Sequence, residues 1–182
     1  YSPQKMTGEV SAAAPPPAVP KPKGPLNLAN RPGEPAFQLK LEPSDKIEMK
    51  YEKGGAAVRA EFKLTNTAKE FQTFKVKCTD NSLFRVRPPI EFLAPGATVL
   101  IRIFLHATSM PEQDKHFFAF YHKKCTADDA KKPPRSMWRP DTKPEGVTRV
   151  LVVFKGEEAA DGSMAAHPDS DTSKVVAVRE RK

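Results

Sequence analysis

Alternation of apolar and polar residues in the middle of the chain is the feature that most restricts its fold. Phe74, Val76 and Cys78 alternate with Lys75 and Lys77. A period of two is what a half-buried strand requires, because successive side chains point to opposite faces of a sheet. This segment therefore predicts a strand with Phe74 and Val76 in a core and the two lysines together on the other face.

The same period recurs in short segments between residues 36 and 155, and Gly, Pro and Asn separate them. Proline and glycine end strands because proline lacks a donor and both favour turns. Short strands at regular spacing predict an antiparallel β-sandwich. The expected strands are 37–41, 47–49, 56–65, 73–79, 83–87, 98–106, 115–123 and 148–154.

Composition divides the chain into a folded domain, residues 36–155, and two tails. Nine of the 19 prolines precede Phe37, and this arm, residues 1–35, has little bulky apolar surface. Such a segment is expected to be disordered or polyproline-like, serving as a linker or as a ligand for a proline-binding groove. Residues 156–182 are small, polar and charged, and we expect this tail to be disordered as well.

The net charge of +8 belongs to the domain, because the arm carries +2 and the tail −2. A basic domain favours an anionic partner. Its lysines and arginines are scattered, however, and no aromatic and basic RNA-binding motif occurs. We therefore expect a solvated basic face and do not expect nucleic-acid binding.

The sequence contains no arrangement of residues that indicates catalysis. It has no nucleophile elbow and no Gly-rich phosphate loop, so we expect neither an enzyme nor a cofactor. His116, His122 and Cys125 have metal-ligand types, but no fourth ligand accompanies them, and we do not expect a metal. No apolar run is long enough to span a membrane. The two cysteines suit a reducing cytosol, so we expect a cytoplasmic protein.

Four sequence runs in this order carry a family resemblance: LTNT, FKVKCT, FRVRPP and LAPG. They resemble the major sperm protein (MSP) domain, whose family includes nematode sperm cytoskeletal proteins and VAP-type adaptors of the endoplasmic reticulum. The resemblance runs from about residue 37 to 154. It implies an immunoglobulin-like sandwich of seven antiparallel strands without a disulfide.

The resemblance also implies a role in protein–protein contact. The first hypothesis is an accessory protein that binds or regulates MSP filaments in nematode amoeboid sperm, located in the cytoskeleton of the pseudopod. A second is a soluble VAP-like adaptor for acidic peptides. A third is a filament subunit that assembles with itself.

Lys75, Lys77 and Thr79 form the sharpest candidate binding site. Parallel lysines on one face can pair with an acidic peptide and support addition of a peptide strand. In VAP-type members the matching run KVKTT helps to bind acidic FFAT-like peptides. Here Cys78 replaces a threonine, and residues 115–119 read KHFFA where VAP has KHKFM.

The expected strand 115–123 is apolar on both faces, which implies a second cover over Phe117, Ala119 and Tyr121. The cover is either the chain's own loop containing Trp138 or a partner subunit, including a second copy in a homodimer. Phe117, Ala119 and Tyr121 are therefore candidate partner contacts.

The tail offers candidate modification sites at Ser170, Thr172 and Ser173, which lie among aspartates. Phosphate there would add nearly two negative charges a site and favour docking on the basic domain. The alternative is an unmodified tail that only aids solubility.

Overall fold

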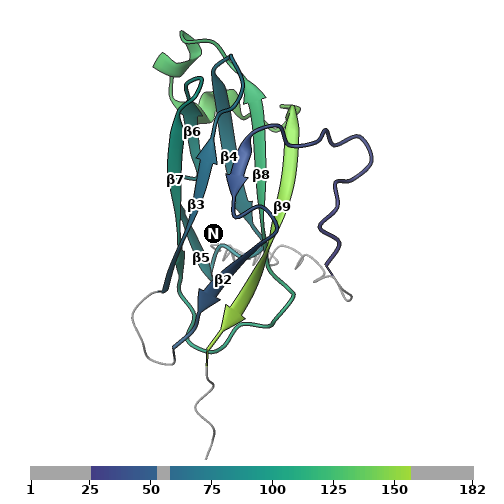
Figure 1. Ribbon diagram of the computed structural model, residues 1–182, viewed down its shortest axis with the longest axis vertical. Helices are drawn as coiled ribbons and strands as arrows, with labels where there is room; N and C mark the ends of the chain where they lie inside the picture. Colours follow the sequence, from purple (N-terminus) through teal and green to yellow (C-terminus); the bar gives the residue numbers. More distant parts are fainter. Residues whose placement is uncertain (1–25, 53–57, 157–182) are drawn as a thin grey trace, which may run out of the picture.

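Two β-sheets packed face to face form the domain in the computed structural model, which describes residues 26–52 and 58–156 (Figure 1). One sheet has the strand order β1-β3-β7-β5, and the other has the order β2-β9-β8-β4-β6. The strands are β1 (Lys40–Glu42), β2 (Lys46–Lys50), β3 (Val58–Thr65), β4 (Gln72–Cys78), β5 (Phe84–Arg87), β6 (Ile90–Leu93), β7 (Thr98–Leu105), β8 (Phe117–Lys124) and β9 (Gly146–Lys155).

The expected all-β, immunoglobulin-like sandwich is confirmed, with two differences in detail. The described residues form nine strands instead of seven, and one of the additional strands, β6, directly follows Pro88-Pro89. In addition, β2 pairs with β9 in parallel, so that Ile47 lies opposite Val152. A period of two reports which face of a strand is buried but not the direction of its neighbour, so the pattern does not reveal this pairing.

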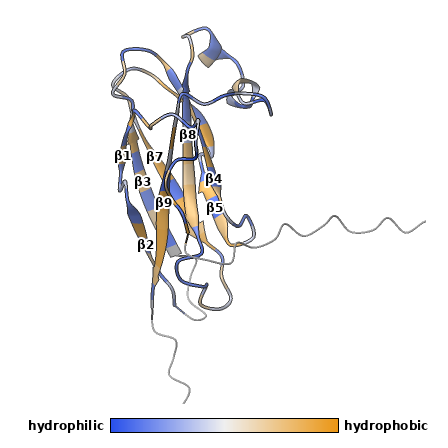
Figure 2. Cartoon of the chain, turned by 90° about the vertical axis from the view of Figure 1, so that its right-hand side faces the viewer, coloured by the Kyte–Doolittle hydropathy of each residue, from blue (hydrophilic) through white to orange (hydrophobic). Residues whose placement is uncertain are grey.

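The core lies between the two sheets, and aromatic rings fill its centre. Phe62 of β3 is 0% exposed. Its ring lies 5.8 Å from that of Phe118 and 4.9 Å from that of Phe120, both edge to face. Apolar colour accordingly runs along the strands, while the loops at the ends of the sandwich are mostly hydrophilic (Figure 2). As the alternation predicts, Phe118 and Phe120 of β8 face inward, and both are fully buried.

Asn66, in the LTNT run, holds the turn after β3 against the neighbouring sheet. Its side chain is buried, and its amide donates to the carbonyl oxygens of Glu70 and Leu93, both at 2.9 Å. Its Oδ1 accepts from the Ala68 N–H at 3.0 Å. Gly96, in the LAPG run, has φ +72° in the turn that donates back to the Asn66 carbonyl. These contacts join the LTNT run to the LAPG run, although the two runs are separate in the sequence.

His122 is a buried polar residue on the inner side of β8. Its Nδ1–H donates to Oε1 of Gln72 at 3.0 Å, and its Nε2 accepts from the Gln38 N–H at 3.2 Å. Burial lowers the pKa of His122 to about 4. Gly146 lies so close that a Cβ there would collide with the imidazole. Both ring nitrogens therefore have protein partners, in a site built for the neutral ring.

The protein is expected to lose roughly 2 kcal/mol of stability between pH 7 and pH 5 through His122. The unfolded chain binds a proton near the ordinary histidine pKa of 6.5, whereas the folded chain resists protonation down to about 4. The stabilisation that the neutral His122 ring provides is therefore fully present above pH 6.5 and declines as the pH falls below this value. Urea unfolding at both pH values measures the loss. The His122→Gln variant should show a flatter dependence, and an equal slope in both proteins would contradict the assignment.

Candidate functional site

The structure brings all six predicted contact residues to the outer face of the five-stranded sheet. Strands β4 and β8 are neighbours there, with Lys75 opposite Tyr121 and Lys77 opposite Ala119. We call this surface the β4–β8 face; its residues are Thr73, Lys75, Lys77, Phe117, Ala119 and Tyr121, with Thr79 at one end. The two strands are about 40 residues apart in the sequence, and their register aligns the predicted residues.

Lysine ammonium groups lie over aromatic rings at the centre of this face. Nζ of Lys75 is 4.7 Å from the ring centroid of Trp138 and 5.9 Å from that of Tyr121, and Nζ of Lys77 is 5.7 Å from Tyr121. Burial, and secondly the charge of Lys77, lower the pKa of Lys75. An aromatic ring attracts a cation through its quadrupole, which orients both lysines along the surface. The result is a compact cationic and aromatic patch.

One end of the face is covered by the loop between β8 and β9, which contains two short 3-10 helices, η1 (Asp129–Lys131) and η2 (Pro134–Met137). Trp138 follows η2, and its indole N–H donates to Oγ1 of Thr73 at 3.1 Å. The loop therefore supplies the cover that the sequence suggested, but only at this end. Phe117 and Tyr121 remain half-buried.

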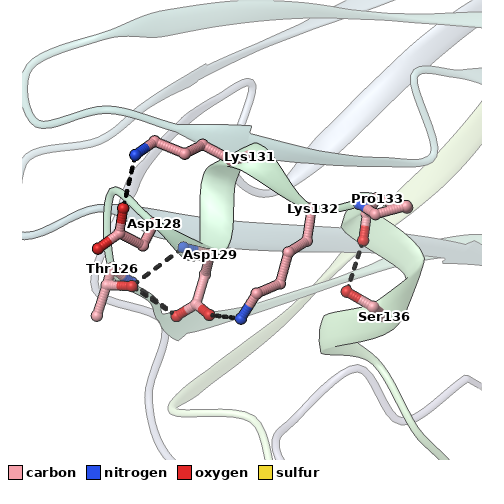
Figure 3. Close-up of polar contacts among 7 residues, drawn as sticks. All are labelled: Thr126, Asp128, Asp129, Lys131, Lys132, Pro133 and Ser136. Atoms are coloured by element: carbon pink, nitrogen blue, oxygen red, sulfur yellow. Dashed lines mark hydrogen bonds and ion pairs between the residues drawn. The ribbon is translucent and has the colours of Figure 1, made fainter.

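Polar contacts within the loop hold it in shape (Figure 3). The Asp129 carboxylate accepts from the backbone N–H and hydroxyl of Thr126, at 3.0 and 2.9 Å, and pairs with Lys132 at 2.9 Å. The hydrogen bond from Lys132, followed by those from Thr126, lowers the pKa of Asp129 to about 2. Lys131 pairs with Asp128 at 2.7 Å. These contacts hold the part of the loop that lies between β8 and Trp138.

At the other end of the face, Thr79 joins β4 to β8. Its N–H donates to the carbonyl of Phe117 at 3.3 Å, and its hydroxyl lies 3.0 Å from Nδ1 of His116. The His116 ring packs edge to face on Phe84. Across residues 26–52 and 58–156 there is no group of three or more His, Cys, Asp or Glu side chains that could hold a metal ion.

The expected addition of a peptide strand beside β4 does not fit the sheet order. β4 pairs with β8 on one side, and over Gln72–Lys75 it pairs with β6 on the other. On the same side as β6, the Val76 N–H donates to the Pro89 carbonyl at 2.8 Å. Backbone groups of β4 are therefore occupied along this stretch, which leaves its outward side chains as the accessible surface.

Arg149 and Glu34 are residues of this region that the sequence did not single out. Arg149 lies in β9 opposite Ala119, and its guanidinium donates two hydrogen bonds to the Glu34 carboxylate, each 2.8 Å long. This hydrogen bonding lowers the pKa of Glu34 to about 2. The side chains are only 5% (Arg149) and 22% (Glu34) exposed. Glu34 belongs to the segment assigned by composition to the N-terminal arm, and its contact makes the end of that arm part of the sheet surface.

We call residues 26–36 the strap. The strap runs beside β9 before it leads to β1 (Figure 1). The Pro35 carbonyl accepts from the Val147 N–H at 3.0 Å, and the Asn30 side chain donates to the Val147 carbonyl at 2.9 Å. An RPGE run in the sequence is the signal that was available, since Pro-Gly favours a turn that orients the following glutamate.

Other expectations fall beyond the part of the chain that is described. Ser170, Thr172 and Ser173 lie outside it, so their phosphorylation stays a prediction. Within the described residues, no helix is both long enough and apolar enough to cross a membrane.

A two-layer sandwich with a cationic and aromatic surface patch defines a binding domain of the immunoglobulin-like class. The model of the MSP (Major sperm protein) domain matches residues 38–143, and the chain belongs to this family. The MSP domain is a protein–protein interaction fold, and its family is one of non-catalytic binding folds.

Relatives come from nematodes and plants. The uncharacterized protein R05D3.5 of Caenorhabditis elegans is 30% identical over 154 residues, which cover 72% of this chain and 84% of the relative. Vesicle-associated protein 4-2 of Arabidopsis thaliana is 40% identical over 67 residues, covering 37% of this chain and 22% of that protein.

Two solved structures from C. elegans share the fold. SSP-19, an MSP-domain protein like family member, has a TM-score of 0.52 at 20% identity, and the match covers 64% of this chain and 98% of that one. WR4, an MSP family member, has a TM-score of 0.53 at 16% identity, covering 65% and 99%.

Proposed function

We propose that this protein is a non-enzymatic accessory protein that binds MSP filaments in the cytoplasm of nematode sperm, in the cytoskeleton of the pseudopod. The observation that carries the proposal is the convergence of Lys75, Lys77 and Tyr121 on one face. The family and the C. elegans relatives support the choice of partner. In this proposal, side chains of that face contact the filament, and no reaction is catalysed.

The composition of the β4–β8 face suits a protein partner. Phe117 and Tyr121 offer partly exposed aromatic surface, and aromatic residues are enriched in the centres of protein interfaces. Lys75 and Lys77 add positive charge beside them, which directs an acidic partner segment to this surface. The face therefore combines apolar area, which gives affinity, with charge, which gives orientation.

The protein is expected to co-sediment with assembled MSP filaments and to stay in the supernatant when it is spun alone. The Phe117→Ala/Tyr121→Ala variant should lose most of this binding, because it removes the aromatic surface. Leu100→Ala is the matched control, since Leu100 is an exposed apolar residue, 46% exposed, on the opposite sheet. A protein that never pellets with filaments contradicts the proposal, and one that pellets alone indicates self-assembly instead.

A second candidate function is that of a soluble adaptor for acidic peptides. The observation that favours it is the pair of lysines held beside Trp138 and Tyr121. Because β4 is paired on both sides over Gln72–Val76, the peptide would lie across the side chains of the β4–β8 face. Direct titration with acidic peptides distinguishes this role from filament binding.

A further inference from the structure

We propose that the strap is a built-in competitor for the binding surface, in which Glu34 occupies the place of an acidic side chain from the partner. The proposal rests on the binding role of the β4–β8 face given above. It adds a third cationic residue, Arg149, to that surface. It also adds a means of control that lies within the chain.

Arg149 belongs to the same row of the sheet as Lys77. Lys77 lies opposite Ala119 on β8, and Ala119 lies opposite Arg149 on β9. Neighbouring strands are about 4.8 Å apart, so the two cationic residues start roughly 10 Å apart with only a methyl group between them. Tyr121, two residues from Ala119 along β8, adds an aromatic ring to the same face, with Nζ of Lys77 5.7 Å from its ring centroid. One extended acidic segment could therefore reach both.

Glu34 is bound as an acidic ligand would be. Two parallel hydrogen bonds of 2.8 Å join its carboxylate to the Arg149 guanidinium, a geometry that arginine offers to carboxylates in general. The Arg31 N–H donates to the same carboxylate at 2.8 Å. Gly33, with φ +85°, gives the turn that aims Glu34 at the sheet.

The rest of the strap is fixed to the sheet by weaker means. No strap residue belongs to the hydrophobic core of the described part of the chain. Its other contacts with β9 are single hydrogen bonds, such as those from Arg149 to the Ala29 carbonyl at 3.4 Å and from the Val147 N–H to the Pro35 carbonyl. Displacing the strap therefore leaves the core cluster intact. It breaks the ion pair of Arg149 with Glu34, which a partner's carboxylate would replace.

Competition lowers the apparent affinity of a partner, because only the fraction of molecules with a displaced strap can bind at Arg149. Removing the charge of Glu34 weakens the strap and leaves Arg149 available. An acidic partner should then bind more tightly, whereas a neutral one should not respond.

The test is calorimetric titration with a short synthetic peptide of glutamate and phenylalanine. The Glu34→Gln variant is expected to bind this peptide about tenfold more tightly than the natural protein. Glu42→Gln is the matched control: it removes the same charge from an exposed ion pair, that with Lys40 on the other sheet, and should change nothing. Circular dichroism establishes that both variants are folded.

Hydrogen exchange at the Val147 amide gives a second, independent result. This amide donates to Pro35 of the strap, so its exchange should speed up when the peptide binds the natural protein. If the peptide binds with equal or lower affinity in Glu34→Gln and Val147 stays protected, the competitor role is wrong while the binding face stands. If neither protein binds the peptide, the competitor role and the adaptor function are both wrong, while co-sedimentation still decides the filament-binding function separately.

Discussion

Replacement of Phe62 by alanine is expected to lower the free energy of unfolding by about 3–5 kcal/mol, the range observed for large aromatic truncations in cores. Phe62 is fully buried, and its ring contacts the rings of Phe118 and Phe120 from the opposite sheet. Its removal leaves a cavity where the two sheets meet, and rigid aromatic neighbours cannot close it easily. Urea denaturation at neutral pH measures the change.

The control for this substitution is Leu100→Ala on β7 of the same sheet. Leu100 points outward and is 46% exposed, so its truncation should cost less than about 1 kcal/mol. A loss below about 1.5 kcal/mol in Phe62→Ala would mean that the sheets collapse around the gap. It would also mean that the aromatic cluster is not the centre of stability.

Reversal of the two lysine charges, Lys75→Glu/Lys77→Glu, is expected to reduce acidic-peptide binding at least tenfold while the protein stays folded. The change places two carboxylates where a partner carboxylate must approach, and it removes both ammonium groups from the aromatic rings. Titration at low and moderate salt measures the loss, and salt should weaken binding of the natural protein more than that of the variant.

Arg85→Glu/Arg87→Glu is a matched control for this double variant. These arginines are also two residues apart on an exposed strand, β5, but they lie on the other sheet. The control therefore changes net charge equally without touching the β4–β8 face. If both double variants lose affinity to the same degree, overall charge and not this face attracts the partner.

Much of the candidate face could be predicted from the sequence, because a period of two directly assigns each residue of a strand to one face of the sheet. Lys75 and Lys77 follow from the alternation of β4, and Phe117, Ala119 and Tyr121 from that of β8. Alternation alone does not show that these two strands pair, but any antiparallel neighbour relation would bring the two outward rows together. The buried half of each strand supports the assignment, because Phe74 and Phe118 lie in the core.

The Glu34–Arg149 pair could not be predicted from the sequence in the same way. The two residues are far apart along the chain, and a proline-rich composition describes the average of an arm, not the individual residues in it that contact the sheet. Arg149 interrupts the apolar run of β9, where a charged residue is unusual unless it has a partner. Such an interruption is a signal that an anion lies nearby, but it does not name which of the acidic residues supplies it.

The parallel pairing of β2 with β9 has a consequence for how the chain is made. Among the described residues β9 is the last strand, yet it joins an early strand, β2, to β8 and supplies Val150, Val152 and Phe154 to the interior. During synthesis, the earlier strands must therefore wait for the final one before the second sheet can close. Such long-range closure slows folding and leaves unpaired strand edges exposed in the meantime. The growing polypeptide is accordingly vulnerable to misassociation just before β9 leaves the ribosome.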